Sequence, residues 1–458
     1  MRDFEVLLRE SLPDYAANAL LDVLGNGSSF AEVSIRLNPL KVSEPDFCFD
    51  MRSVPWCKDA YFLSERPNFT LDPSFHAGAY YVQDSSSMFP ALIADKILDS
   101  LSPKGAVLDL CASPGGKSTH LLSILKDKRP TVVCNEAVGK RVPPLTDNIA
   151  KWGAANVVVT NTSAASIGRF PGFFDVILAD VPCSGEGMFR KSEDAVSGWS
   201  LGSVQECASL QRSIISDVWP ALREGGLMIY STCTYNHLEN QDNVRFIAEQ
   251  LGAEYLSVNA ESLVPGLVAL EWGYQFVPGL VPGEGQFFAV LRKNSGQASG
   301  GRIKPSRKAR FVAEKGSGLI MDHQNNQLYM LECDGKGAVD FANGLSEINP
   351  YCVKTLGCRV GEIKAGKLVP DADFALFAAI SGSDGKVSTL KFSSAEIDLE
   401  TALKFLSREN ITPQPSWPRG YILLKYRSLG LGFVNNLGNR CNSLHPLHRR
   451  ILNKHQNI

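Results

Sequence analysis

Six short, almost wholly apolar segments recur between residues 103 and 293, each separated from the next by a stretch of helical character. Apolar runs of this length, rich in β-branched residues, indicate strands that are covered on both faces. Strands that alternate with helices in this way predict a doubly wound, Rossmann-like α/β sheet. The predicted strands are AVLDLC (106–111), TVVCNE (131–136), NVVVTN (156–161), FDVILAD (174–180), GLMIYST (226–232) and FFAVLRK (287–293).

The length of the chain predicts further domains around this sheet. Its 458 residues exceed what one ordinary core organises, so two or three domains are expected. A Gly-, Ser-, Lys- and Arg-rich stretch without apolar periodicity is typical of a linker. We expect a mixed α/β N-terminal extension (1–100) with a strand in 30–41, the doubly wound domain (101–293), a basic linker (294–308), a small α/β domain (309–400) and a β-rich domain (401–458).

Composition excludes several classes of protein. With 44% apolar and 21% charged residues, the chain has the composition of a soluble globular protein. No apolar run reaches the roughly 18 residues that a membrane helix needs, and the acid-containing start MRDFEVLLRESLPDYAANALL resembles neither a signal nor a transit peptide. Eleven cysteines without a C-x-x-C pair fit reduced thiols. We therefore expect a cytoplasmic protein with no membrane partner and no metal.

Positive charge is concentrated in two stretches, although the formal net charge is −2. Arg292–Arg310 holds seven Lys or Arg and no acid, and Asn410–Ile458 holds seven more with three His and no acid. Phosphate contacts supply most non-specific affinity for nucleic acids, so such stretches suit a polyanion. RNA or DNA is the expected partner, and a solvated linker with a basic tail is the alternative.

The stretch VLDLCASPGGKSTHLL (107–122) predicts a strand, a glycine loop and a helix in succession. Gly115 and Gly116 allow a close approach of backbone to a ligand, and the start of the helix favours anionic or polar groups. Doubly wound sheets bind cofactors in this crevice. The loop matches neither G-x-G-x-x-G nor G-x-x-x-x-G-K-[ST], which leaves dinucleotide binding weakly supported. Glu136, at the end of the next strand, is placed to accept hydrogen bonds from a ribose diol.

Two cysteines are predicted at one edge of the sheet. Asp180 ends the fourth strand, and Pro182 terminates it so that Cys183 is presented on a turn above the crevice. The fifth strand ends in STC, which places Cys233 at the same edge. Most cysteines are small buried hydrophobes. Two thiols that converge on one crevice, with an acid between them, favour a chemical role instead.

These motifs resemble those of a known family. They run through IRLNPLK, YYVQDSSSM, DLCASPGGKSTHL, DVPCSGEGMFRK, STCTYNHLENQDNV and GEGQFFAVLRK, over most of residues 1–293. The chain is similar to the Sun/nucleolar-protein family of RNA cytosine-C5 methyltransferases, and within it to the bacterial RsmF-like branch that methylates small-subunit ribosomal RNA. The ending GYILLKYRSLGLGFVNNLGNRCNSLHP resembles the PUA-like RNA-binding domain of that branch. The resemblance implies a class I methyltransferase fold, S-adenosylmethionine as cofactor, and ribosomal RNA or the small ribosomal subunit as partner.

The chemistry of that family explains the residue types. C5 of cytosine is a poor nucleophile, so a thiolate first adds at C6, and the C5 proton must leave before the thiol is eliminated. By resemblance, Cys233 is the nucleophile and Cys183 assists the breakdown of the adduct. In DNA cytosine-C5 enzymes the cysteine of the PC motif attacks, so order along the sequence does not assign the two roles. The resemblance also implies that Asp180 meets the N3/N4 edge of cytosine and that Lys117 positions the base or the cofactor.

The same resemblance implies a cofactor site built on several loops. Arg141 is expected to support the cofactor loop or to contact RNA. Ser163 stands where relatives commonly carry an acid near the adenine, and its hydroxyl offers a weaker hydrogen bond than a carboxylate does. The expected cofactor-binding residues are Cys111, Ala112, Ser113, Pro114, Gly115, Gly116, Lys117, Glu136, Ser163 and Asp180.

Two alternatives stay open from the sequence, and a third is disfavoured by its motif. Transfer RNA is the second substrate candidate, because such a pocket reaches single-stranded or flipped bases. An amino-group methyltransferase is expected to carry D/N-P-P-[YF] in place of DVPC. A non-catalytic RNA-binding assembly factor with the same fold has no need of both cysteines, the glycine loop and Glu136, all of which are present.

Overall fold

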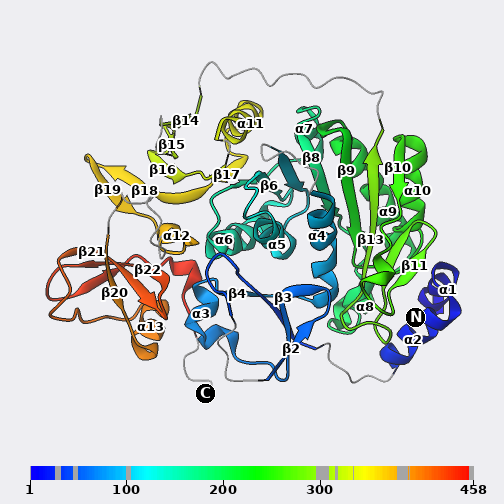
Figure 1. Ribbon diagram of the computed structural model, residues 1–458, viewed down its shortest axis with the longest axis horizontal. Helices are drawn as coiled ribbons and strands as arrows, with labels where there is room; N and C mark the ends of the chain where they lie inside the picture. Colours follow the sequence, from blue (N-terminus) through cyan, green and yellow to red (C-terminus); the bar gives the residue numbers. More distant parts are fainter. Residues whose placement is uncertain are drawn as a thin grey trace.

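The computed structural model describes residues 2–25, 32–44, 50–98, 105–294, 309–314, 318–333, 335–378, 390 and 392–452. Within these residues the central sheet has ten strands, in the order β11-β12-β13-β9-β8-β5-β6-β7-β17, with β10 paired to β13 (Figure 1). The strands are β5 (Ala106–Asp109), β6 (Thr131–Asn135), β7 (Val157–Thr160), β8 (Phe174–Asp180), β9 (Leu222–Thr232), β10 (Ala253–Leu256), β11 (Val268–Leu270), β12 (Gly273–Phe276), β13 (Gln286–Lys293) and β17 (Val353–Leu356).

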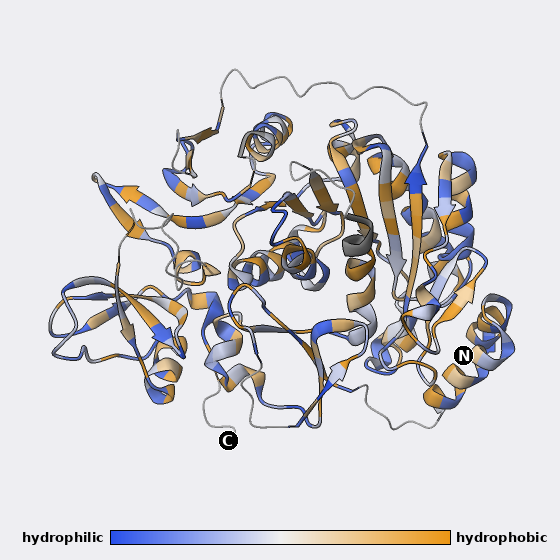
Figure 2. Ribbon diagram, in the orientation of Figure 1, coloured by the Kyte–Doolittle hydropathy of each residue, from blue (hydrophilic) through white to orange (hydrophobic). Residues whose placement is uncertain are grey.

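This sheet confirms the predicted α/β fold class. All six predicted segments form strands, and the pairs from β7 through β6, β5 and β8 to β9 are parallel. Strand β13 pairs antiparallel to β9. Every residue of β5, β6 and β7 is buried, as their near-continuous apolar sequence predicts. The middle strands are accordingly drawn mostly in the hydrophobic colours of Figure 2.

Helices cover both faces of the sheet. On one face lie α4 (Ser85–Leu98), α5 (Gly116–Ile124) and α6 (Val142–Trp152), and on the other lie α7 (Ala164–Gly168), α9 (Leu201–Val218) and α10 (Gln241–Gln250). Helix α6 buries Val142, Leu145, Ile149 and Trp152, which lie three or four residues apart on one stripe. It ends at Gly153, whose φ of +76° is a left-handed conformation that glycine adopts without strain. The parallel strands thus end at one common edge between the helices.

The N-terminal extension begins with the helices α1 (Arg2–Ser11) and α2 (Asp14–Gly25) and includes a four-stranded sheet in the order β2-β3-β1-β4. The strand predicted within 30–41 is limited to β1 (Ser34–Leu37), because a turn begins at Asn38. The carbonyl of Asn38 accepts hydrogen bonds from the backbone N–H groups of Lys41 and Val42. The other elements are β2 (Met51–Val54), β3 (Cys57–Leu63), α3 (Pro73–His76) and β4 (Tyr80–Val82).

Two further sheets follow the doubly wound domain. One contains β14 (Phe311–Ala313), β15 (Leu319–Asp322), β16 (Gln327–Met330), β18 (Cys358–Lys364) and β19 (Lys367–Pro370), and the other contains β20 (Ser393–Glu396), β21 (Gly420–Tyr426), β22 (Leu429–Asn436) and β23 (Cys441–Ser443). The associated helices are α11 (Gly335–Ile348), α12 (Ala372–Ala375) and α13 (Leu399–Leu406).

The connections between these parts differ from a simple string of domains. Strand β17 pairs antiparallel with β7, so a segment between β16 and β18, two strands of the five-stranded sheet, extends the central sheet. Strand β20 pairs with β21, so the C-terminal sheet includes residues before 401. Residues 295–308, nearly all of the predicted linker, lie outside the described residues. None of the helices in the described ranges combines the length and apolarity needed to span a bilayer.

Candidate active site

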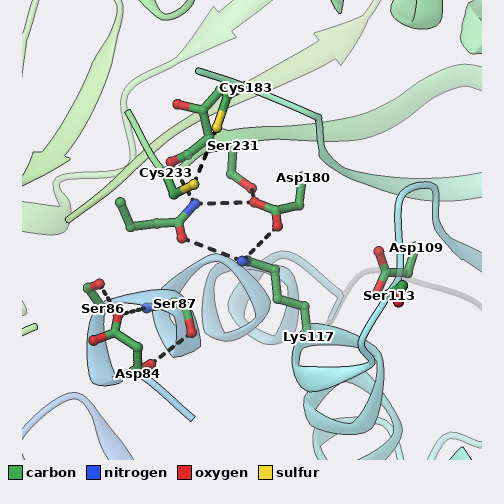
Figure 3. Close-up of polar contacts among 12 residues, drawn as sticks. Asp84, Ser86, Ser87, Asp109, Ser113, Lys117, Asp180, Cys183, Ser231 and Cys233 are labelled. Carbon is green, nitrogen blue, oxygen red and sulfur yellow. Dashed lines mark hydrogen bonds and ion pairs between the residues drawn. The ribbon is translucent and has the colours of Figure 1, made fainter. Parts of the chain in front are cut away.

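The two cysteines predicted at the sheet edge face each other. Cys183 lies on the turn after β8, and Cys233 directly follows β9, the parallel neighbour of β8. Their Sγ atoms are 3.3 Å apart (Figure 3). The contact with Cys233, together with burial, raises the pKa of Cys183 well above its ordinary value. The same contact with Cys183 lowers the pKa of Cys233. The contact between the sulfurs therefore favours one thiolate in the pair, and the thiolate is the form in which a thiol attacks.

An ion pair lies beside the thiols. Lys117 reaches from α5 to Asp180 at the end of β8, and Nζ donates to Oδ2 at 2.9 Å (Figure 3). Burial disfavours the charged lysine, but the neighbouring Asp180 carboxylate outweighs it and raises the pKa of Lys117. Asp180 Oδ1 accepts from Ser231 Oγ at 2.7 Å. The site thus presents a fixed cation and a fixed anion next to the thiols.

Gln286 and Ser231 belong to this cluster, although the sequence analysis singled out neither. The Gln286 amide Nε2 donates to Asp180 Oδ1 at 3.3 Å and to the Thr232 carbonyl at 2.8 Å, and Lys117 Nζ donates to Gln286 Oε1 at 3.4 Å. A sequence signal existed: Gln286 is a polar residue at the start of an apolar strand, within the GEGQFF motif. What the sequence did not show is that β13 lies next to β9.

Two buried carboxylates hold the cysteine loops together. Glu186, three residues after Cys183, accepts from the backbone N–H groups of Tyr235 at 2.7 Å and Asn236 at 3.2 Å on the Cys233 loop. Glu239, on the Cys233 loop, accepts from the Ser184 N–H at 3.0 Å on the Cys183 loop. Glu186 is 1% exposed and Glu239 fully buried. Each loop therefore carries the acceptor for the other loop's backbone donors.

We expect Glu239→Gln to lower the free energy of unfolding by about 1–3 kcal/mol, because an amide replaces one of the two carboxylate oxygens and leaves a buried polar contact unmade. Glu239 Oε2 accepts from Ser184 N–H and Gln211 Nε2, and Oε1 accepts from Asn236 Nδ2. Urea unfolding measures the loss. Glu206→Gln alters an exposed carboxylate on the outer face of α9 and is the matched control. It should change the free energy of unfolding by less than about 0.5 kcal/mol. Equal losses in the two variants would contradict the role of Glu239 in holding the two cysteine loops together.

The predicted cofactor loop follows β5 and is held by hydrogen bonds from residues that follow β6. Gly115 has a φ of +111°, a conformation that favours glycine, and directly precedes α5. Arg141 Nη2 donates to the Ser113 carbonyl at 2.8 Å, and Ser113 Oγ donates to the Arg141 carbonyl at 2.6 Å. Asn148 Nδ2 donates to the Pro114 carbonyl at 2.8 Å. Of the two roles expected for Arg141, the structure shows support of the cofactor loop. Cys111 and Ala112 connect β5 to this loop.

The carboxylate of Glu136 fits the ribose-binding role predicted for it. Glu136 directly follows β6 and is 3% exposed, and its Oε1 accepts from the Val138 N–H at 2.8 Å. Within the described part of the chain, Oε2 accepts no hydrogen bond and lies 3.7 Å from Arg141 Nε. A buried carboxylate oxygen without a hydrogen bond is costly and points to a donor supplied by a ligand. The residues present therefore fit a ribose-bearing cofactor at this edge.

We expect Glu136→Ala to weaken S-adenosylmethionine binding about 10- to 100-fold, because hydrogen bonds to a charged group contribute about 1.5–3 kcal/mol. Titration calorimetry with S-adenosylmethionine measures the dissociation constant. Glu254→Ala removes an exposed carboxylate of β10 that pairs with Arg292 on the surface of the same sheet, and it should bind like the wild type. Unchanged affinity in Glu136→Ala would remove this residue from the cofactor site.

Asp109 and Ser163 flank the loop and Glu136. Asp109 ends β5, and burial raises its pKa to about 7, although Ser118 Oγ donates to it at 2.6 Å. Ser163 follows β7, and its Oγ caps α7 by accepting from the Ser166 N–H at 3.2 Å. Ser163 is exposed, at the same end of the sheet as Glu136. Its predicted contact with the adenine stays a prediction.

The N-terminal extension braces the site at two points. Arg36 on β1 is buried, and its guanidinium donates to the Gly116 carbonyl at 3.2 Å and to Thr119 Oγ1 at 2.6 Å, both on α5. On the other side, Ser11 Oγ of α1 accepts from the His237 N–H at 2.8 Å, on the loop after Cys233. The extension thus contacts both the cofactor loop helix and a cysteine loop.

Three family models match the chain. The model of the 16S rRNA methyltransferase RsmB/F matches residues 97–292, that of the N-terminal domain of 16S rRNA methyltransferase RsmF matches 2–85, and that of the methyltransferase RsmF PUA domain matches 392–451. These ranges include β5–β13, the N-terminal sheet and the C-terminal sheet.

Similar proteins agree with the models. Ribosomal RNA small subunit methyltransferase F of Aeromonas salmonicida is 34% identical over 294 residues, which are 61% of this chain and 61% of that protein. The protein of the same name from Shewanella loihica is 28% identical over 435 residues, 90% of this chain and 88% of that protein. The crystal structure of NSun6 from Pyrococcus horikoshii with SFG matches 65% of this chain and 99% of that chain, with a TM-score of 0.53 and 18% identity, and so supports the fold.

The strand order, the glycine loop before α5 and the methyltransferase neighbours define the class of protein: a Rossmann-like methyltransferase with added N-terminal and C-terminal domains. The three family models then identify it more closely. The chain belongs to the RsmB/F family of 16S rRNA methyltransferases and carries the N-terminal and PUA domains of its RsmF branch. This match confirms the family predicted from the sequence motifs.

Proposed function

We propose that the protein methylates C5 of a cytosine in 16S ribosomal RNA, through a covalent bond between Cys233 and C6 of the base. The observation that carries the proposal is the pair of thiols 3.3 Å apart beside the Lys117–Asp180 ion pair. A C5 methyltransferase needs a nucleophilic thiol and a second group beside it to end the adduct, whereas an amino-group methyltransferase needs neither.

The residues of this chain take the following roles. Cys233, whose pKa is lowered by Cys183, adds to C6 as a thiolate. Asp180 and Lys117 bind the polar edge of the base and stabilise the charge that develops on the ring. S-adenosylmethionine, when bound, supplies the electrophilic methyl group. Water then takes up the C5 proton, and the electron pair of that C–H bond restores the C5–C6 double bond. The C6–S bond breaks and leaves its electron pair on the Cys233 sulfur, and Cys183 promotes this last step from 3.3 Å away.

The cofactor is proposed to lie along the carboxyl ends of β5, β6 and β7. Residues 111–117 surround the methionine part and Glu136 accepts the ribose hydroxyls through Oε2. Asp180 lies between this site and the base, since it bonds Lys117 of the cofactor loop helix. Ser163 is placed near the adenine. Support comes from Glu136 Oε2, which accepts no hydrogen bond from the described residues, and from the similar NSun6 structure with SFG.

RNA is the proposed macromolecular partner, and the PUA-domain match supports it. The relatives' names favour ribosomal RNA over transfer RNA, and the small subunit is the form in which we expect the RNA to bind.

We place the reaction in the cytoplasm, where small subunits of bacterial ribosomes assemble. The predicted domain limits stay proposals: 1–100, 101–293, 294–308, 309–400 and 401–458. The C-terminal sheet begins earlier than the last of these limits, at β20.

The test compares three RNA substrates. Purified protein is incubated with methyl-labelled S-adenosylmethionine and with protein-free 16S transcript, isolated small subunits or total transfer RNA, and bisulfite sequencing then maps 5-methylcytosine. We expect label at a defined cytosine of 16S RNA. Label in transfer RNA alone would replace the proposed substrate, and label in none of the three would overturn the proposed activity.

A further inference from the structure

Gln286 introduces a neutral amide into the charged cluster of the site. It is the first residue of β13 and is 2% exposed. In the antiparallel pair of β13 and β9, Phe287 lies opposite Thr232. The preceding residue, Gln286, therefore lies opposite Cys233, the residue after Thr232. Its carboxamide lies beside the Lys117–Asp180 ion pair and makes a hydrogen bond to each of the two side chains. A hydrogen-bonding side chain therefore stands beside the two charged groups, at a position that begins an otherwise apolar strand.

The orientation of the amide is determined by its donors. Nε2 carries two hydrogens, and it donates to the Thr232 carbonyl at 2.8 Å and to Asp180 Oδ1 at 3.3 Å. With both donors engaged, Oε1 is turned toward Lys117 Nζ. Two acceptors, Oε1 and the Asp180 carboxylate, therefore flank the lysine, which is a donor only.

This pattern complements one pyrimidine. Cytosine carries an amino group with two donor hydrogens at C4, whereas uracil carries an acceptor oxygen there. Two fixed acceptors can take the two N–H donors of cytosine, with Lys117 left for a ring or carbonyl acceptor. The O4 oxygen of uracil is itself an acceptor, so it could form a hydrogen bond with neither of these two acceptors. Sites built to hydrogen-bond a polar group reject analogues that lack it strongly, because buried partners are then left unpaired.

We propose that Gln286 determines base specificity: its Oε1 accepts one N–H of the target cytosine's amino group while Asp180 accepts the other. The proposal rests on the proposed function, since it assigns a contact to the base methylated there. The competing role is purely structural, in which Gln286 only joins β13 to the Thr232 carbonyl at the end of β9.

The experiment removes the amide from the protein and the amino group from the base in turn. Splint-ligated 16S RNA carries either cytosine or pyrimidin-2-one, which lacks the amino group, at the mapped position. Gln286→Met and the matched control Gln275→Met, which removes a buried carboxamide from β12, are each made in the Cys183→Ala background, where the adduct is expected to persist. They are compared with Cys183→Ala alone by the rate of covalent adduct formation on denaturing gels. Thermal unfolding and S-adenosylmethionine affinity are measured for each variant.

A direct contact predicts coupling between the two deletions. We expect Gln286→Met to slow adduct formation with cytosine about 10- to 100-fold and with pyrimidin-2-one less than about 3-fold, while Gln275→Met affects both RNAs alike. Equal losses with both RNAs in Gln286→Met, or no loss with cytosine, would overturn the inference and leave the proposed function standing. Failure of Cys183→Ala to form an adduct with either RNA would overturn the covalent role of Cys233 in the proposed function and the inference with it.

Discussion

Cys233→Ala is expected to abolish methyl transfer, with a loss of about 10⁴-fold or more, because no other group replaces a nucleophile that forms a covalent bond. The thiol follows β9, lies 3.3 Å from Cys183 and has a lowered pKa, and for these reasons we propose it as the sulfur that adds to C6. Transfer of labelled methyl groups to 16S RNA measures the loss. Cofactor affinity should stay unchanged, since the cofactor loop is held by Arg141 and Asn148 instead.

The matched control for this substitution is Cys441→Ala. Cys441 is a partly buried free thiol on β23 of the C-terminal sheet, so its loss tests the general effect of removing a cysteine. It should retain methyl transfer within about 3-fold of the wild type, as substitutions away from special features change little. Equal activity of the wild type and Cys233→Ala would remove Cys233 from the mechanism.

Cys183→Ala is expected to give the opposite phenotype, a trapped protein–RNA adduct. A group that promotes elimination must lie beside the C6–S bond, and Cys183 lies 3.3 Å from the sulfur that forms it. With alanine at this position, Cys233 still adds to the base, but the adduct persists. The adduct should survive on a denaturing gel as a slowly migrating band, and turnover should fall below about one methyl group per protein molecule.

The double variant Cys183→Ala/Cys233→Ala controls for the origin of this band. It should form no adduct, because the nucleophile is gone. Adduct formation by Cys233→Ala, together with its absence in Cys183→Ala, would exchange the two roles. That outcome matches the arrangement in which the cysteine of the PC motif attacks.

Several site residues were predictable because they end parallel strands. Asp180 follows from its place at the end of β8, Cys233 from its place after β9, and Glu136 from its place after β6. Parallel strands of a doubly wound sheet end at one edge, so residues at those ends meet whatever the loops between them contain. The glycine loop before α5 is equally local, since strand, loop and helix are consecutive in the sequence.

Other site residues were not predictable, because their partners lie far away along the chain. Gln286 contacts Asp180 across 106 residues, through a strand that pairs antiparallel to β9. Glu186 and Glu239 resemble ordinary surface acids in sequence and are buried only because the two cysteine loops enclose them. Arg36, in a separate sheet, supports α5 across 80 residues. No local pattern specifies such contacts.

The sequence by itself determined the doubly wound sheet, the positions of the two cysteines at its edge and the loop that precedes α5. These depend on hydrophobic periodicity and on residues at strand ends, which are local properties of the chain. Only the tertiary structure decided that the two sulfurs lie 3.3 Å apart, that Gln286 joins Lys117 and Asp180, and that β17 extends the sheet beside β7. Those contacts arise from packing between distant segments, which determines distances and pKa values that periodicity does not encode.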